Sequence, residues 1–372
     1  MIERILIAGG GTGGHVYPAG AVAEEVLARR TDASVVFVGT EHGMEARIVP
    51  GLGYQLATIS ASRLVGTGLV KRIKGLALLV MGIWQSLKLL RRHRPQVVLG
   101  MGGYASGPAL LAAWMCRYPT AIQEQNATPG LTNRVLGRLV RAVYLGFSGA
   151  QTHFSGEKTK VTGNPLRRAV VNALNTQAPG RDARSRPFSI LVFGGSQGAR
   201  FLNEHVPVAL GHLHHMAPDL AFQVVHQTGP ADEAITRTRY EHEGLSNNVK
   251  VLSYIEDMPR AYEDADLALC RAGALTVAEI TAVALPSLLV PFPHAAGNHQ
   301  EANAQALVTA GAARMTRQDE WSNEEVGAYL RQLAQDPQQL KNMSDAAHSL
   351  SHTEAAASVV DHLEAMILGR AA

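Results

Sequence analysis

The sequence is poor in cysteine and in charged residues. Two cysteines, Cys116 and Cys270, lie far apart among 372 residues, and neither belongs to a Cys-x-x-Cys or Cys/His pattern. This spacing excludes a disulfide framework and a structural zinc site, and we expect both thiols to be buried as small apolar side chains. Only 17% of the residues are charged and 46% are hydrophobic, which excludes a disordered chain. A chain of 372 residues is long enough for two domains of ordinary size.

Carboxylates are nearly absent from one long stretch. Between residues 46 and 156 the single acidic residue is Glu124, against 13 lysines and arginines. Residues 1–156 hold 16 Lys and Arg against 7 Asp and Glu, whereas 157–372 hold 18 against 24. So basic a surface predicts an anionic partner: nucleic acid, phospholipid headgroups or a phosphorylated substrate.

No apolar run is long enough to cross a bilayer, which needs about 20 residues. The run at 76–84 lies within 69–94, and basic clusters flank it, the first being Lys71, Arg72 and Lys74. This arrangement suits a segment that lies on an anionic membrane, with Leu79 and Trp84 facing it. A core helix with a solvated basic end is the alternative. Nucleic acid fits less well, because there is no RNA-binding signature.

The same organisation occurs twice along the chain. Short apolar runs alternate with helix-length segments, which predicts βαβ units around parallel sheets in two Rossmann-like α/β domains. We expect the domains to be 1–163 and 164–352; the tail from about Glu354 predicts a helix that fits either domain, and we assign 353–372 to the first. The start of the chain has no separate basic and apolar targeting regions, so a cytosolic enzyme is expected. The predicted strands are 5–8, 35–38, 55–59, 97–100, 121–123 and 142–145, then 189–193, 222–225, 249–252, 267–269 and 287–290.

Glycine loops follow three of these strands, at 9–15, 100–108 and 193–200. Glycine lets the backbone approach a ligand closely, and a following helix directs its N–H groups at an anion. Gly9, Gly11 and Gly14 satisfy the dinucleotide pattern GxGxxG, but the acidic residue expected about 20 residues later is missing. There is no GK[ST] either, which argues against a P-loop enzyme.

Seven motifs in order resemble those of the MurG family: GGGTGGHVYPA, VLGMGGYASGP, QEQNATPGLTNR, VTGNPLR, GGSQGAR, CRAGALTVAEI and VPFPHAAGNHQEANA. The resemblance implies the GT-B fold, with two domains facing a cleft, and no cofactor. It also implies transfer of N-acetylglucosamine (GlcNAc) from UDP-GlcNAc to the 4-hydroxyl of lipid I, the undecaprenyl-pyrophosphoryl-MurNAc-pentapeptide, which gives lipid II of peptidoglycan. Such an enzyme works as a peripheral protein at the cytoplasmic face of the plasma membrane, and proteins of cell-wall synthesis and division are further partners that the family suggests.

By the same resemblance, the second domain binds the donor. Ile255 would lie at the uracil, Glu279 at the ribose, and Gln300 at the sugar, with Asn298 a further candidate beside it. Without the resemblance, we would interpret Glu279 as a carboxylate near the start of a helix, where the helix dipole stabilises it. The remaining donor-binding residues are Thr12, Gly13, Gly14, Asn126, Arg167, Ser196, Ala274, Leu275, Thr276, Val277 and Ala278, and the acceptor-binding residues are Gly10, Gly11, Gly103 and Tyr104.

Two residues are candidates for the general base. His15 precedes a helix whose dipole should lower the pKa of the imidazole and keep it neutral. It could also merely donate to a phosphate or cap the helix. Glu124 is the second candidate, as base or as a residue that orients the acceptor. Family members often read HEQN where this chain has Gln123-Glu124-Gln125-Asn126, so a role for a histidine at that position does not apply.

Other functions remain open from the sequence. A UDP-GlcNAc 2-epimerase shares the fold and the donor, and a nicotinamide-dependent dehydrogenase would bind its cofactor through the first domain. The pattern Asp264-Ala265-Asp266 invites a metal site, but it lies where a helix passes into a strand, and we interpret it as capping. We therefore expect no metal in the chemistry.

Overall fold

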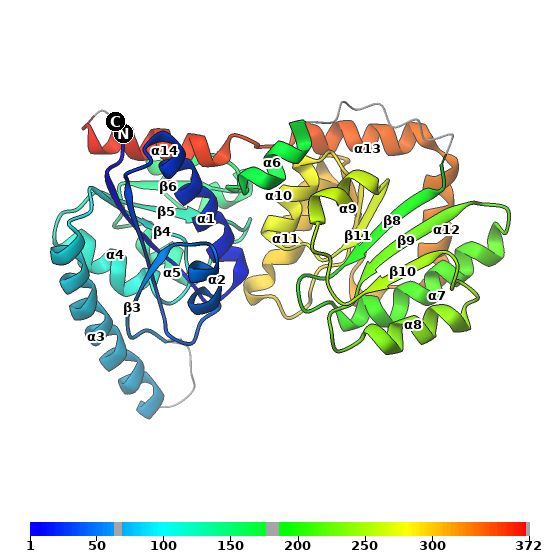
Figure 1. Cartoon of the computed structure of the whole chain (residues 1–372), viewed down its shortest axis with the longest axis horizontal. Helices are drawn as coiled ribbons and strands as arrows, with labels where there is room; N and C mark the ends of the chain where they lie inside the picture. The colour runs from blue at the N-terminus through cyan, green and yellow to red at the C-terminus, as the bar shows by residue number, and fades with distance from the viewer. Residues whose placement is uncertain (63–68, 176–185, 370–372) are drawn as a thin grey trace. The chain divides into compact units, whose positions relative to one another are not determined.

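The computed structural model describes residues 1–62, 69–175 and 186–369, and the side chains of 69–74 and 173–175 are outside that description. The chain forms two compact units (Figure 1). Unit 1 comprises Met1–Arg168 and His352–Ala372, and unit 2 comprises Ala169–Ser351. The segment PGRDARSRP, residues 179–187, has the composition of a surface loop and lies mostly outside the described residues.

Unit 1 is built on a seven-stranded parallel sheet in the order β3-β2-β1-β4-β5-β6-β7. Its inner strands are almost continuously apolar, because helices cover both faces of a parallel sheet. The strands are β1 (Arg4–Ala8), β2 (Ser34–Gly39), β3 (Gln55–Thr58), β4 (Val97–Gly100), β5 (Thr120–Glu124), β6 (Ala142–Leu145) and β7 (Thr159–Val161).

Side chains alternate between two cores in unit 1. Ile5 and Ile7 of β1 face one core, to which α14 contributes Val359 and Leu363, while Leu6 faces the other core under α4. Figure 1 shows α14 beside α1, and α3 beside α4. The helices are α1 (Gly13–Arg29), α2 (Glu45–Gly51), α3 (Leu69–His93), α4 (Ser106–Met115), α5 (Leu131–Leu136) and α14 (Ala355–Ile367), with short 3₁₀ turns at Ser148–His153 and Gly156–Lys158.

Unit 2 repeats the plan on a six-stranded parallel sheet in the order β10-β9-β8-β11-β12-β13. Its core joins β8 residues such as Ile190 to α7 and α12. The strands are β8 (Phe188–Phe193), β9 (Phe222–Gln227), β10 (Val249–Leu252), β11 (Leu267–Cys270), β12 (Ser287–Leu289) and β13 (Ala313–Met315). The helices are α6 (Arg168–Asn175), α7 (Arg200–Met216), α8 (Glu233–His242), α9 (Met258–Asp264), α10 (Ala274–Ala282), α11 (His299–Thr309), α12 (Asn323–Gln335) and α13 (Pro337–Ser349), with 3₁₀ turns at Ala296–Asn298 and Gln318–Glu320.

The prediction of two Rossmann-like α/β domains is confirmed, and each predicted strand is present. In both sheets the strand order reverses beside the first strand, between β1 and β4 and between β8 and β11. Ligands of open α/β sheets bind at the carboxyl ends of the strands at such a reversal. The loops after β1 and β8 are therefore the places to look for binding sites.

The prediction for one cysteine is wrong. Cys270 is buried in β11, but Cys116 is exposed. Cys116 caps the carboxyl end of α4 and lies one residue beyond Met115, which is also exposed. Its position at the end of the helix removes it from the core that the rest of α4 faces.

Candidate active site

The first glycine loop connects β1 to α1. Thr12 has extended backbone angles and caps α1, so that Gly13 and Gly14 begin the helix and His15 occupies its third position. Gly11 has φ of +88°, which glycine adopts without strain. Thr12 and Gly14 are exposed and His15 is partly exposed, so the loop and the imidazole both reach solvent.

The hydrogen bonds of His15 define its tautomer. Its Nδ1 lies 3.0 Å from the Gly10 carbonyl oxygen and 3.2 Å from Thr12 Oγ1. A carbonyl oxygen only accepts, so in the neutral imidazole Nδ1 carries the proton and Nε2 holds the lone pair. This is the state that a general base requires at Nε2.

Glu45 lies beneath this loop, and sequence reasoning missed it. The side chain is 1% exposed; Oε2 accepts the Gly11 N–H at 2.8 Å, and Oε1 accepts the N–H and the hydroxyl of Thr40 at 2.9 and 2.7 Å. Burial raises the pKa of the Glu45 carboxyl, but these hydrogen bonds outweigh it and hold the pKa below its ordinary value. Glu45 is thus an ionised anchor for the loop at neutral pH.

The second glycine loop packs against the first. A Cβ on Gly103 would lie 2.2 Å from the Gly10 carbonyl oxygen, and Gly102 and Gly103 have φ of +91° and +80°. A Cβ on Gly102 would lie 3.0 Å from His15 Nε2, and one on Gly11 would lie 3.5 Å from the Tyr104 ring. The structure therefore brings together the four residues predicted to bind the acceptor, next to His15.

Glu124 is a buried anchor for a third loop. It is 2% exposed and accepts the N–H groups of Asn126 at 3.0 Å and Gly130 at 3.1 Å, and the side-chain amide of Asn133 at 3.0 Å. Burial raises the pKa of the Glu124 carboxyl, against the opposing effect of these hydrogen bonds. The donors that surround it indicate that Glu124 orders residues 126–133.

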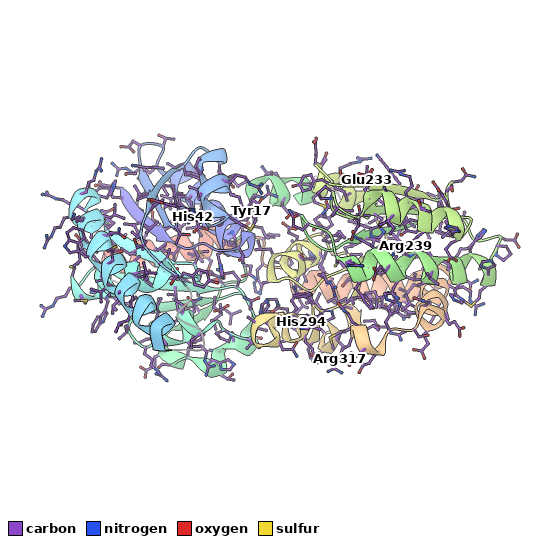
Figure 2. All side chains as sticks on the ribbon, turned by 90° about the horizontal axis from the view of Figure 1, so that it is seen from below. Tyr17, His42, Glu233, Arg239, His294 and Arg317 are labelled. Atoms are coloured by element: carbon purple, nitrogen blue, oxygen red, sulfur yellow. The ribbon has the colours of Figure 1, made fainter. Side chains whose placement is uncertain are left out.

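Arg167 lies over an aromatic ring of its own unit. Its guanidinium carbon is 5.1 Å from the centre of the Tyr17 ring, and Tyr17 projects from α1 (Figure 2). Such stacking holds a guanidinium in place without neutralising its charge. The guanidinium of Arg167 therefore lies beside the first turns of α1.

In unit 2, the third glycine loop connects β8 to α7 and holds Ser196 exposed. Gly195 has φ of +93°, and a Cβ on Gly198 would lie 1.7 Å from the Thr228 carbonyl oxygen. The amide of Gln227 donates to the Gly195 carbonyl at 2.9 Å and accepts the Ile255 N–H at 2.8 Å. Gln227 thus connects two predicted donor-binding segments, the third glycine loop and the stretch around Ile255.

The first turns of α10 contain six of the predicted donor-binding residues, Ala274 to Glu279. Glu279 is partly exposed, and its Oε2 accepts the Tyr262 hydroxyl at 2.8 Å. In α11, Gln300 Oε1 accepts the Phe292 N–H at 2.9 Å. Asn298, before it, is left-handed with φ of +55° and donates to Glu301.

Asp266 has structural partners. One oxygen accepts the Ser189 N–H at 2.8 Å, and the other accepts the Arg186 guanidinium. Asp264 accepts Arg260 Nε at 3.0 Å. In the described part of the chain, no group of three or more His, Cys, Asp or Glu residues could hold a metal ion.

The helix predicted to lie on a membrane is α3. Trp84 is 57% exposed, under the ammonium of Lys88 at 3.3 Å, whereas Leu79 is only partly exposed. The exposed apolar residues Leu76, Val80 and Trp84 instead follow one another at intervals of four on one helix face. The side chains of Lys71, Arg72 and Lys74 lie outside the described residues. Among the described residues, no helix is long and apolar enough to cross a membrane.

Two Rossmann-like units, each with a glycine loop at the reversal of its strand order, define a two-domain α/β enzyme of the GT-B glycosyltransferase fold. Comparison with family models supports this class. The glycosyltransferase family 28 N-terminal domain matches residues 5–145, and the corresponding C-terminal domain matches residues 189–362.

Individual relatives narrow the class further. The Myxococcus xanthus UDP-N-acetylglucosamine--N-acetylmuramyl-(pentapeptide) pyrophosphoryl-undecaprenol N-acetylglucosamine transferase is 46% identical over 96% of this chain and 91% of its own. The crystal structure of Acinetobacter baumannii MurG superposes with a TM-score of 0.79 at 30% identity, over 97% of this chain and 99% of that one. The chain belongs to the MurG family of glycosyltransferases.

The epimerase alternative has a structural counterpart. The UDP-GlcNAc 2-epimerase from Neisseria meningitidis, solved bound to UDP-GlcNAc, superposes with a TM-score of 0.68 over 98% of this chain and all of that one. At 14% identity, this likeness shows the fold alone. The transferase interpretation is favoured.

Proposed function

We propose that this enzyme transfers GlcNAc from UDP-GlcNAc to the 4-hydroxyl of lipid I and so produces lipid II. The observation that carries the proposal is the 46% identity to a transferase of this name, which extends over nearly the whole of both chains. The tautomer of His15 supports the chemistry, since a hydroxyl acceptor needs a base and Nε2 offers a lone pair.

In the proposed reaction, the acceptor hydroxyl attacks the anomeric carbon and gives its proton to His15 Nε2. The bond from that carbon to the UDP oxygen breaks, the configuration inverts, and the electron pair leaves with UDP. The N–H groups at the start of α10, together with Ser196 and Arg167, stabilise the charge on the departing diphosphate. The proposal requires no metal and no cofactor.

We assign the acceptor to unit 1 and the donor nucleotide to unit 2. In unit 1, we assign the pyrophosphate of lipid I to the two packed glycine loops, at Gly10, Gly11 and Gly103 and beside Tyr104. In unit 2, Ile255 lies at the base, Glu279 at the ribose and Gln300 at the sugar. Thr12 to Gly14 and Asn126 are assigned to the donor sugar from unit 1.

Between the two candidates for the base, the structure favours His15. The oxygens of Glu124 accept hydrogen bonds from two backbone N–H groups and two side-chain amides, and the side chain is almost fully buried. A carboxylate so surrounded is better suited to holding Asn126 in place than to taking a proton from a substrate. We therefore give Glu124 a positioning role.

We further propose that the enzyme is peripheral at the cytoplasmic face of the membrane and docks through α3. The exposed apolar row of Leu76, Val80 and Trp84 would enter the interface, and the basic residues of α3 would contact anionic headgroups. A lipid-linked substrate would then reach unit 1 without leaving the bilayer surface.

The decisive experiment uses UDP-GlcNAc labelled in the sugar with a lipid-linked muramyl-pentapeptide acceptor. Label should appear in the lipid product only when the acceptor is present. Conversion of UDP-GlcNAc to its 2-epimer without acceptor would instead establish the epimerase.

Thermal unfolding tests the third candidate, the nicotinamide-dependent dehydrogenase. A ligand at 100 times its Kd adds about 2.7 kcal/mol to the free energy of unfolding. Stabilisation by NADH alone would contradict the proposal.

A further inference from the structure

The peptide group between Gly10 and Gly11 is held at both ends. Its N–H donates to Glu45 Oε2 at 2.8 Å, and its carbonyl oxygen accepts from His15 Nδ1 at 3.0 Å. A trans peptide is planar, and its N–H and C=O point in opposite directions. The partner that fixes the N–H therefore also fixes the direction of the carbonyl that His15 meets.

This peptide group is easy to reverse in the absence of such a partner. Both flanking residues are glycine, and Gly11 already has φ of +88°, a conformation that glycine exchanges with negative φ at little cost. Reversal would turn the N–H toward His15 in place of the carbonyl. An N–H facing Nδ1 requires a lone pair there, so the imidazole proton would move to Nε2.

We propose that Glu45 is a positioning residue that determines which imidazole nitrogen of His15 carries the proton. By holding the Gly10–Gly11 peptide in one orientation, its carboxylate keeps the proton on Nδ1 and the lone pair on Nε2. The inference rests on the proposed function, in which Nε2 accepts the proton of the acceptor hydroxyl.

The surroundings of Glu45 are built for a carboxylate. Three glycines from three segments enclose it: a Cβ on Gly10, Gly39 or Gly43 would lie within 2.4 Å of a Glu45 atom. Its three partners all donate, two of them backbone N–H groups that cannot reverse their role. A glutamine would have to direct its NH₂ group at one of those two N–H groups.

The first test is a double-mutant cycle on GlcNAc transfer. We expect Glu45→Gln to lower kcat about tenfold to hundredfold, as a misplaced catalytic group does, with KM for UDP-GlcNAc little changed. In the His15→Ala background, Glu45→Gln should cost almost nothing more, because the two substitutions remove one function. An equal loss in both backgrounds would indicate a merely structural role and overturn the proposal. Glu41→Gln, which removes an exposed carboxylate four residues earlier, is the matched control and should retain full activity.

The second test observes the tautomer directly. Imidazole ¹⁵N shifts, with His15 assigned by the signals missing from His15→Ala, should show a protonated Nδ1 in the wild type and in Glu41→Gln, and a shift toward protonated Nε2 in Glu45→Gln. An unchanged tautomer in Glu45→Gln would overturn the proposal even if turnover fell.

A second variant covers the case in which Glu45→Gln does not fold. Glu45→Asp withdraws the carboxylate from Gly11 by one methylene, so a smaller tautomer shift of the same sign is expected. A Glu45→Asp tautomer equal to that of the wild type would count against the inference. If His15→Ala itself turned over normally, the assignment of His15 as base would fail, while the tautomer measurement would still decide the role of Glu45.

Discussion

The glycine loops after β1 and β8 open helices of equal length. α1 and α7 each have 17 residues and each contains a proline, Pro18 and Pro207. The loops even share a left-handed glycine, with φ of +88° at Gly11 and +93° at Gly195. Backbone geometry alone would give them the same function.

The side chains that brace the two loops are chemically different. An ionised carboxylate, Glu45, holds the first loop, whose helix carries a histidine in its first turn. A neutral amide, Gln227, holds the third loop, which exposes Ser196. This difference fits the proposed division of roles, in which the first loop carries the base and the third loop binds the diphosphate.

Removing the imidazole of His15 is the strongest test of the proposed difference between the two loops. We expect His15→Ala to lower kcat of GlcNAc transfer by about 10²–10⁴, the usual contribution of a general base, with little change in the affinity for UDP-GlcNAc. Ser196 is assigned to a diphosphate that is already charged in the bound donor, so Ser196→Ala should raise KM for UDP-GlcNAc, with a smaller effect on kcat than His15→Ala. Steady-state kinetics of both variants measure these effects. Near wild-type turnover of His15→Ala would contradict the proposed division of roles between the first and third glycine loops.

Unit 2 also contains histidines, and one of them, His226, is part of its core. His226 is 1% exposed, contacts the Tyr240 hydroxyl and Asn203, and burial lowers its pKa to about 3. Between pH 6.5 and 3 the unfolded chain takes up a proton here that the folded unit does not, so stability falls as the pH falls. We expect a loss of about 2 kcal/mol from pH 7 to pH 5.

Urea unfolding of unit 2 can be followed through Trp321, after Trp84 and Trp114 of unit 1 are replaced by phenylalanine. His226→Gln should lower the stability at pH 7 and flatten its decline below pH 6.5. A decline as steep as in the parent would show that other groups cause it.

The donor role of unit 2 is tested at Glu279. Removing a charged acceptor of ribose hydroxyls should raise KM for UDP-GlcNAc about tenfold, or about 1.4 kcal/mol, with kcat nearly unchanged. We expect this result for Glu279→Gln. Tyr262→Phe, which removes only the hydroxyl that donates to Glu279, should have a much smaller effect. An unchanged KM in Glu279→Gln would remove Glu279 from the donor site.

The smallest effect concerns the surface. The exposed apolar row of α3 belongs to unit 1, whereas Ile235 is an exposed apolar residue of unit 2, 51% accessible on α8. Val80→Ser should weaken binding to phosphatidylglycerol vesicles about fourfold, near the ~0.8 kcal/mol of one buried methylene. Ile235→Ser should leave vesicle binding unchanged, and both variants should bind UDP-GlcNAc normally. Equal effects at the two positions would exclude α3 as the specific docking face.

The sequence predicted the interior of both sheets well, because buried parallel strands are apolar on both faces. It missed β7 and β13, which lie at the sheet edges and have three residues each, TKV and ARM. An edge strand is paired on one side and partly exposed, so it lacks the apolar run. Contacts over long sequence separation were also missed. Glu45 accepts a hydrogen bond from Gly11, 34 positions earlier in the chain, and no local sequence pattern predicts this contact.

The return of α14 to unit 1 has a consequence for synthesis on the ribosome. Val359, Val360 and Leu363 of this helix complete the core that begins with Ile2 and Ile5. Unit 2, residues 169–351, is translated before α14. Unit 1 therefore cannot complete this core until the whole of unit 2 has been translated, and that part of its core stays uncovered until then.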